Sequence, residues 1–149
     1  MVDQLLLKTF EEKNKLEIEL SNLRRHVDHL HRDLVHLEKL FKSILIQSKK
    51  HMVRLVGGGF MSGRLEVKID GEWGTVCDDY FGTDDANVVC KQLGYSSGVV
   101  RDQAYYGMGS LKILMDDVAC LGSELAIQNC RYKREHDCSH SEDVGVICS

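Results

Sequence analysis

The 149-residue sequence contains no proline, and its first 52 residues contain neither cysteine nor glycine. The missing proline and the missing Gly-X-Y period exclude a collagen-like or proline-rich stalk. No stretch of about 20 apolar residues occurs, so no segment of this sequence is expected to cross a membrane. What remains is a chain of two different parts, because all 13 glycines and all six cysteines lie at or after Gly57.

Net charge also differs between the two parts. Residues 1–52 carry ten Lys and Arg against eight Asp and Glu, a net charge of +2, whereas residues 53–149 carry nine against fifteen, a net charge of −6. An acidic domain does not attract the phosphates of nucleic acids. We therefore expect no nucleic acid as a dedicated partner.

Six cysteines within about a hundred residues predict a disulfide framework, because the hydrophobic core of so small a domain is marginal by itself. The residues alone leave the pairing open. A zinc site with His136, Cys138 and His140 is the alternative, although the sequence has no C-x-x-C pair. Disulfides predict an extracellular protein, either secreted or the ectodomain of a cell-surface receptor. The N-terminus does not resemble a signal peptide, so we expect any signal or membrane anchor to lie upstream.

An unbroken heptad repeat occupies much of the N-terminal part. Its apolar residues recur at alternating intervals of four and three, which is typical of a coiled coil. They are Leu16, Leu20, Leu23, Val27, Leu30, Leu34, Leu37, Phe41 and Ile44. A helix of about 40 residues would extend roughly 60 Å, too far for the C-terminal domain to cover, although a helix packed on that domain is the alternative. We predict a coiled-coil oligomerisation segment over residues 1–50.

The residues beside this apolar seam indicate how many helices the coiled coil contains. Leu40 at g and Leu45 at e widen the seam, which favours a trimer over a dimer. The segment also contains four histidines: His26, His29, His31 and His36. His26 at g and His31 at e would face each other across neighbouring helices. Loosening of the interface on protonation is one hypothesis for them, and four solvated side chains without a role is the other.

The C-terminal part begins with strong strand and turn signals. Residues 64–69 alternate strictly between apolar and polar, and the Asp-Gly pair at 70–71 predicts a hairpin into a second strand, 72–77. Thr83 is a plausible N-cap with two acidic residues behind it, where the helix dipole favours them. Gly94 would end that helix.

Acidic residues adjoin the cysteines in three places. Asp78 and Asp79 follow Cys77, Asp116 and Asp117 follow a strand that begins at Lys112, and Asp137, Glu142 and Asp143 precede a final strand over 144–148. If disulfides gather the cysteines, these carboxylates converge. Convergent carboxylates without matching basic residues suit a hard, oxygen-binding cation such as Ca²⁺. The alternative is a set of scattered surface acids.

A family resemblance rests on six motifs in order: VRLVGG, GRLEV, GEWGTVCDD, ANVVCKQLGY, DDVAC and HDCSHSEDVGVICS. With these motifs, residues 53–149 resemble a scavenger receptor cysteine-rich (SRCR) domain, and six cysteines resemble its group A. The resemblance implies an α+β fold in which a curved antiparallel β-sheet cradles one α-helix, here after an N-terminal α-helical coiled coil. It also implies three disulfides: Cys77–Cys138, Cys90–Cys148 and Cys120–Cys130.

A heptad segment before such a domain is similar to the layout of class A scavenger receptors, which are trimers at the cell surface. This sequence lacks the Gly-X-Y stretch and the membrane span of those receptors. Their collagen-borne ligand binding therefore cannot be carried over to it.

The resemblance further implies that the domain binds one or two cations. Carried over by position, one Ca²⁺ site uses Asp78, Asp79 and Glu142. A second site, where Mg²⁺ is also possible, shares Asp79 and adds Asp116 and Asp137. Bound Ca²⁺ would reverse the local negative charge, so that an anionic group of a ligand could complete the coordination. Basic residues that could assist, or that serve only as ordinary surface charges, are Arg64, Arg101, Arg131, Lys133 and Arg134.

We therefore predict an oligomeric extracellular recognition module of scavenger-receptor type, with a role in innate immunity. It would bind polyanionic or repetitive ligands, such as microbial surfaces and modified proteins, with avidity from several heads. A protein-specific adhesion or receptor module that docks one partner protein is the alternative, and a structural spacer is a further one. An enzyme is not expected, because no serine elbow, H-E-x-x-H motif or phosphate loop occurs and oxidised cysteines are not nucleophiles.

Overall fold

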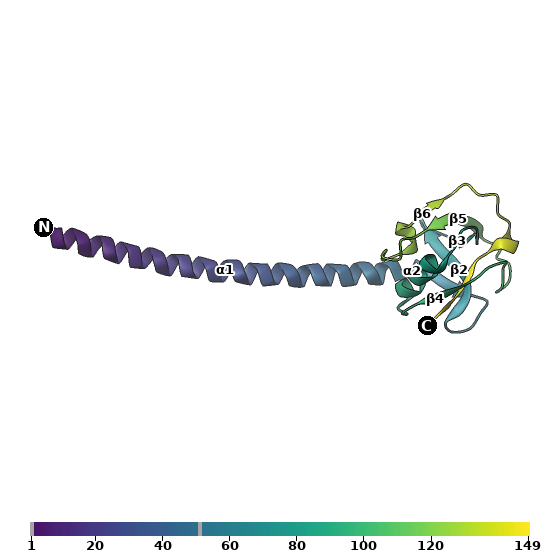
Figure 1. Ribbon diagram of the computed structural model, residues 1–149, viewed down its shortest axis with the longest axis horizontal. Coiled ribbons are helices and arrows are strands. Elements are labelled where there is room, and N and C mark those ends of the chain that lie inside the picture. The colour runs from purple at the N-terminus through teal and green to yellow at the C-terminus, as the bar shows by residue number, and fades with distance from the viewer. Residues whose placement is uncertain (1, 51) are drawn as a thin grey trace. The chain divides into compact units, whose positions relative to one another are not determined.

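The computed structural model describes residues 2–50 and 52–149. The chain divides into two compact units between Ser43 and Ile44. Helix α1 spans Val2–Lys50 without interruption (Figure 1). A helix of this length is possible because the segment contains no glycine or proline, the two residues that most disfavour a helix interior. None of the described helices combines the length and apolar character that crossing a membrane requires.

The apolar seam of α1 lies open in the single chain. Leu23 and Leu30 at d positions are 65% and 66% exposed, and Phe41 at an a position is 70% exposed. Most of the stability of a helix in a protein comes from packing of its apolar face. The described residues leave this apolar face exposed, and the coiled coil stays a prediction.

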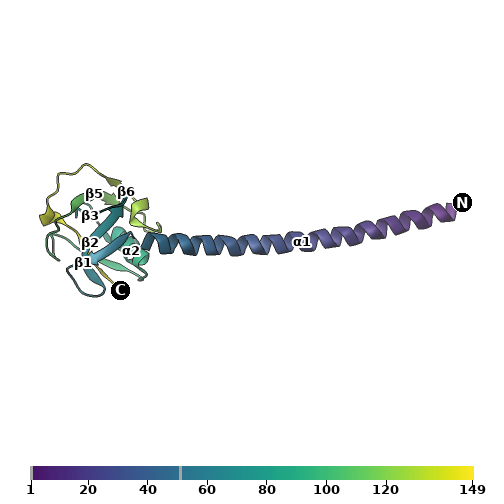
Figure 2. The same ribbon diagram turned by 180° about the vertical axis from the view of Figure 1, so that it is seen from behind.

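The second unit is built on a seven-stranded sheet (Figure 2). Its strands are β1 (Val53–Val56), β2 (Ser62–Ile69), β3 (Glu72–Val76), β4 (Gly98–Arg101), β5 (Lys112–Ala119), β6 (Arg131–Lys133) and β7 (Gly145–Cys148). The order across the sheet is β4-β7-β2-β3-β5-β6, and β1 pairs with β2. The pairs are antiparallel except for β3 with β5, which run parallel.

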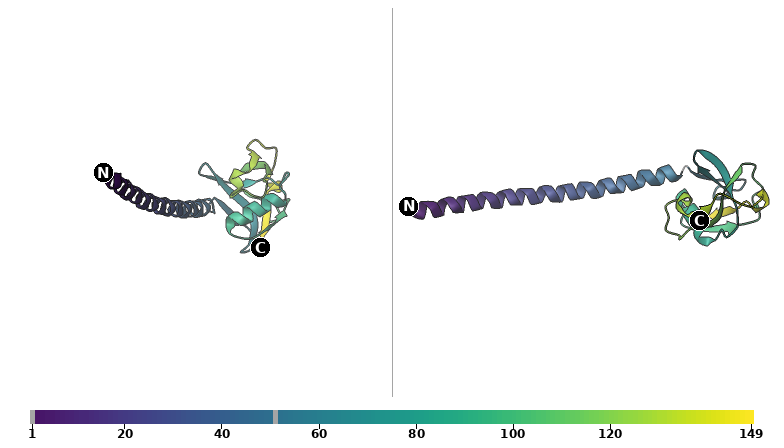
Figure 3. Two further views of the ribbon diagram at one scale, coloured as in Figure 1. Left: turned by 60° about the vertical axis from the view of Figure 1, so that its left-hand side comes forward. Right: turned by 90° about the horizontal axis from the view of Figure 1, so that it is seen from above.

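One α-helix and two short 3-10 helices complete this unit. Helix α2 spans Thr83–Leu93, and the 3-10 helices are η1 (Ile127–Asn129) and η2 (His140–Glu142). Figure 3 shows α2 lying against the sheet. Its buried residues Val88 and Val89 belong to the same core as Leu65 and Val67 of β2. The α+β fold with a curled sheet around one helix is confirmed.

Local turn chemistry explains where two elements begin and end. Asp70 and Gly71 both have positive φ angles, 51° and 87°, and join β2 to β3 as the hairpin prediction requires. The prediction of Thr83 as an N-cap is wrong, because Gly82 is the cap and Thr83 is the first helical residue. Asp85 explains the difference, since its Oδ2 accepts a 2.7 Å hydrogen bond from the Gly82 N–H.

Three disulfides close the domain: Cys77–Cys138, Cys90–Cys148 and Cys120–Cys130. This is the pairing that the family resemblance implies, and it leaves no free cysteine. A zinc site using Cys138 and its neighbouring histidines is therefore excluded, because a disulfide sulfur is not a thiolate. Two of the bridges join segments that are 61 and 58 residues apart, and so fix the long-range arrangement of the loops.

Candidate metal centre

The acidic residues converge where β3 ends. Cys77 forms an isolated antiparallel bridge with Asp143, and the Asp78 N–H donates a 2.8 Å hydrogen bond to the Glu142 carbonyl. The Cys77–Cys138 disulfide ties the loop before η2 to the same place. Backbone pairing and one covalent bond thus bring together acids that lie more than 60 residues apart in the sequence.

Asp79 and Asp116 form the centre of this group. A carboxylate oxygen of each lies within 4.8 Å of the other and of the sulfurs of Cys77 and Cys138. The Cys138 Sγ is 3.8 Å from Asp79 Oδ2. Because both sulfurs belong to a disulfide, they border the site but are not thiolate ligands. The two carboxylates are therefore its candidate metal ligands.

Asp116 is the buried member, with only 4% of its surface exposed. It lies within β5, which continues through Asp116 and Asp117 and does not end before them as the sequence suggested. Asp116 Oδ1 accepts a 2.7 Å hydrogen bond from the Asp117 N–H, and Asp117 has a left-handed φ of 48°. Such a backbone is costly for a residue other than glycine, and such residues cluster at functional sites.

An open hollow of about 540 Å³ lies beside these two carboxylates. Asp137 lines it, so three of the residues predicted for the second cation site share one hollow: Asp79, Asp116 and Asp137. Sequence reasoning missed Tyr80, Glu135 and His136, which line the same hollow. Tyr80 also has a positive φ of 57°, which no sequence signal indicated.

Repulsion between the acids affects the pKa of Asp79. Partial burial raises the pKa of its carboxyl above the usual value, and the negative charges of Asp116, Glu142, Asp78 and Asp137 raise it further. Each member of the predicted ligand set therefore contributes to one negative potential. Such a potential favours uptake of a proton or of a cation.

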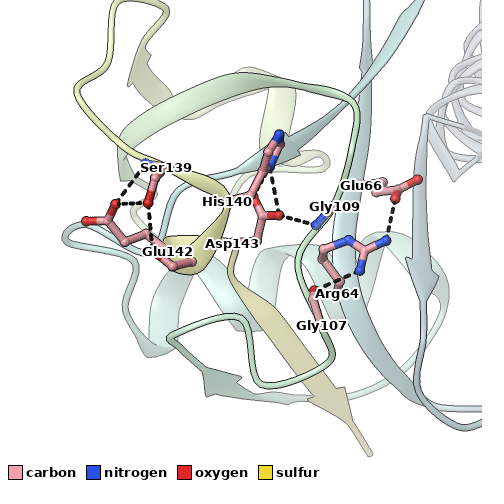
Figure 4. Close-up of polar contacts among 9 residues, drawn as sticks. Arg64, Glu66, Gly107, Gly109, Ser139, His140, Glu142 and Asp143 are labelled. Atoms are coloured by element: carbon pink, nitrogen blue, oxygen red, sulfur yellow. Dashed lines mark hydrogen bonds and ion pairs between the residues drawn. The ribbon is translucent and has the colours of Figure 1, made fainter.

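Asp78 and Glu142 lie to one side and are partly engaged already. Burial raises the Asp78 pKa, a hydrogen bond from the Gln103 N–H lowers it, and the charges of Asp102, Glu142 and Asp143 raise it. The Glu142 pKa is lowered, because its Oε2 accepts hydrogen bonds from the N–H and the hydroxyl of Ser139 (Figure 4). The second oxygen of Asp78 and that of Glu142 accept none of these hydrogen bonds.

Asp143 lies inside the domain and is not one of the scattered surface acids that were the alternative prediction. It is 1% exposed, and its Oδ2 accepts a 2.6 Å hydrogen bond from the Gly109 N–H. His140 Nδ1 lies 3.0 Å from the same oxygen (Figure 4). These contacts engage the Asp143 carboxylate within the domain.

The family model of the scavenger receptor cysteine-rich domain matches residues 56–149. The chain belongs to the scavenger receptor cysteine-rich family. Domains of this family are recognition modules, and disulfide-bonded SRCR domains are typically extracellular.

Individual relatives agree with this assignment. A scavenger receptor cysteine-rich domain superfamily protein of Patiria pectinifera is 46% identical over 101 residues, which cover 65% of this chain and 9% of that protein. The third SRCR domain of murine neurotrypsin is 46% identical with a TM-score of 0.61, covering 64% of this chain and 94% of that one. The dimeric form of the SRCR domain of mouse MARCO is 44% identical with a TM-score of 0.57, covering 65% and 94%.

The basic residues predicted to bind a ligand differ in how far other residues of the SRCR domain already engage them. The Arg64 side chain is 11% exposed and donates to Glu66 Oε1 at 3.1 Å and to the Gly107 carbonyl at 2.8 Å (Figure 4). Glu66 is itself buried and is shared with Arg54, whose Nη2 lies 2.6 Å from Glu66 Oε2. Arg64 therefore contributes to the structure of the sheet, and a role for it in ligand binding stays a prediction.

Three of the other basic residues lie on or next to β6. Lys133 lines the acidic hollow and forms a 2.5 Å ion pair with Asp117. Arg134 pairs with Asp70 at 2.8 Å, and Arg131 is exposed. On β4, the Arg101 guanidinium lies over the Tyr105 ring, 5.7 Å from its centre. Lys133 is thus the basic residue that borders the candidate metal centre.

Proposed function

We propose that this protein is an oligomeric extracellular recognition module whose SRCR domain binds anionic ligands through Ca²⁺. The observation that carries the proposal is the pair formed by Asp79 and the buried Asp116. Among the described residues, no Lys or Arg forms an ion pair with either carboxylate, since Lys133 pairs with Asp117 instead. A buried carboxylate beside a second one is unfavourable unless a cation compensates them.

The donor set fits a hard cation. Ca²⁺ accepts carboxylate oxygens in irregular arrangements, and an open hollow leaves room for water or a ligand oxygen in the remaining positions. Asp79, Asp116 and Asp137 would hold the principal ion, in an arrangement that Mg²⁺ could also occupy. Asp78 and Glu142, with Asp79 shared, would hold a second and weaker ion, because each already accepts hydrogen bonds.

Bound Ca²⁺ would change what the domain attracts. Residues 53–149 carry a net charge of −6 and repel polyanions. A divalent ion at Asp79 and Asp116 offsets the charge of these two carboxylates and presents open coordination positions to a sulfate, phosphate or carboxylate. Lys133 at the rim could add a hydrogen bond to the same anion.

Several heads on one coiled coil would convert a weak contact into avidity. The exposed seam of α1 supports homo-oligomerisation, with three helices favoured over two because Leu40 at g is also exposed. Joining heads can raise apparent affinity for a repetitive surface by about 10² to 10⁴-fold. This suits recognition of microbial surfaces or modified proteins, and so a role in innate immunity.

Calorimetric titration of Ca²⁺ into the purified chain tests the metal centre. We expect binding that the Asp79→Asn variant abolishes, since the variant removes the shared carboxylate without changing its shape. Asp70→Asn is the matched control, because Asp70 is an exposed acid in a turn that asparagine tolerates. The proposal would be contradicted if the wild type gave no heat of Ca²⁺ binding, or if Asp79→Asn and Asp70→Asn gave equal heats.

Competition separates this function from the adhesion alternative. The chain would be bound to a candidate surface in Ca²⁺, and dextran sulfate would be added as a generic polyanion. Release by dextran sulfate and by chelation supports polyanion recognition. Release by chelation alone supports a module that docks one partner protein through Ca²⁺.

A further inference from the structure

A cluster of histidine side chains lies in helix α1. His26 and His29 are three residues apart, so they share one face of the helix. Both line one surface groove of about 300 Å³, together with Asn22 and Arg25. Imidazole nitrogens prefer borderline transition metals, whereas the carboxylates of the SRCR domain prefer hard cations. The two clusters therefore differ in the kind of metal they suit.

The hydrogen bonds of these two rings match those of metal-binding histidines. His26 Nδ1 lies 2.9 Å from the Asn22 carbonyl oxygen. Because a carbonyl oxygen only accepts, this nitrogen carries the ring hydrogen and the neutral ring has its lone pair on Nε2. His29 Nδ1 lies 2.8 Å from Asp33 Oδ2, which is again an acceptor. A metal-bound histidine commonly donates one ring N–H to a backbone carbonyl or a carboxylate and binds through the other nitrogen.

A neighbouring helix supplies a third ring in the proposed oligomer. In a parallel coiled coil, a g position faces the e position five residues further along the next helix. His26 occupies g and His31 occupies e. His31 of the neighbouring helix therefore faces His26, and the neighbouring pair of helices presents three imidazoles at one place. Three histidines with one open position form a common Zn²⁺ site.

We propose that His26 and His29 of one helix and His31 of the neighbouring helix bind a Zn²⁺-type transition-metal ion at each interface between helices. This inference rests on the proposed oligomerisation of α1. Asp33 acts through His29 by fixing its ring, and water completes the coordination. Each contact between a g position and the facing e position forms one such site, and a closed parallel oligomer has one such contact per chain, so it binds one ion per chain whether it is a dimer or a trimer.

The test uses the full chain without an affinity tag, in buffer free of Ca²⁺. Its oligomeric mass is measured by light scattering, and Zn²⁺ is titrated by calorimetry. We expect one Zn²⁺ per chain, loss of binding in His26→Ala/His29→Ala, and about 10- to 100-fold weaker binding in Asp33→Ala, as is usual for the partner of a metal-bound histidine. His31→Ala should weaken binding at least as much. His36→Ala, one heptad after His29, should leave it unchanged.

The outcomes distinguish this inference from the function on which it rests. An oligomer that binds no Zn²⁺, or whose binding survives His26→Ala/His29→Ala, overturns the zinc site and leaves the oligomer intact. Full affinity in His31→Ala overturns sharing between helices. A monomeric chain overturns both the oligomer and the shared site. Variants with unchanged mass and unchanged helix content by circular dichroism exclude loss of folding as the cause.

Discussion

The double variant Cys77→Ala/Cys138→Ala tests whether a covalent bond assembles the metal centre. The sulfurs of this bridge lie within 4.8 Å of carboxylate oxygens of Asp79 and Asp116. Without the bridge, the loop that carries Asp137 is held at its two ends, by the pairing of β6 with β5 and by the bridge between Cys77 and Asp143. We expect Ca²⁺ affinity to fall, because a carboxylate on an unconstrained loop must be ordered when the ion binds.

The stability effect can be estimated from the length of the closed loop. The Cys77–Cys138 bridge closes a loop of 61 residues, and the chain-entropy relation gives a cost of about 4 kcal/mol for its removal. The Cys120–Cys130 bridge closes only 10 residues, for which the same relation gives about 3 kcal/mol. The two losses in the free energy of unfolding are similar in size.

This similarity makes Cys120→Ala/Cys130→Ala the matched control. Urea denaturation, followed by circular dichroism, would measure the free energy of unfolding of both double variants. Calorimetry on the folded fraction would then measure Ca²⁺ affinity. We expect comparable destabilisation in both variants and weakened Ca²⁺ binding only where the bridge beside Asp79 is missing. Unchanged Ca²⁺ affinity in a folded Cys77→Ala/Cys138→Ala variant would refute the claim that this disulfide assembles the site.

Two further predictions concern charge and assembly. The Asp79 pKa is raised in the folded state, so its ionisation disfavours folding as pH rises through that pKa, and the penalty is complete above it. Asp79→Asn should therefore raise the melting temperature of the Ca²⁺-free protein at pH 7. Added Ca²⁺ should raise the melting temperature of the wild type but not that of the variant. A lower melting temperature of the Ca²⁺-free variant would contradict the reasoning. Leu30→Glu places a charge at a central d position of α1, and we expect light scattering to show monomers. Glu38→Gln, at a flanking e position, should keep the oligomer, and an oligomeric Leu30→Glu would argue against the seam.

Sequence periodicity was sufficient for the elements whose cause is local. The heptad intervals and the absence of glycine predicted the helix that became α1 (Val2–Lys50). Alternation and the Asp-Gly pair predicted the hairpin between β2 and β3, and Gly94 ends α2 in the left-handed conformation. Family motifs added the α+β class and the pairing of the cysteines, which spacing alone leaves open.

Burial could not be predicted from residue types at several charged positions. Arg64 was expected at the surface, yet its donors are directed to Glu66 and the Gly107 carbonyl. Aspartate is usually exposed, yet Asp143 accepts a hydrogen bond from the Gly109 N–H inside the domain. Both outcomes depend on contacts with a segment more than 30 residues away, Gly107 for Arg64 and Gly109 for Asp143, which no local pattern encodes. The left-handed backbones of Tyr80 and Asp117 also had no sequence signal.

The sequence by itself determined which residues are acidic, where the helical segment lies and that the cysteines would be oxidised, because these follow from composition and short-range periodicity. Only the tertiary structure decided that Asp116 is buried beside Asp79, that Lys133 is occupied by Asp117, and that Asp137 borders the same hollow. The physical reason is that these relations depend on a parallel pairing of β3 with β5 and on a bridge between residues 61 positions apart. Such long-range constraints bring the charges together, and the charges alone do not specify them.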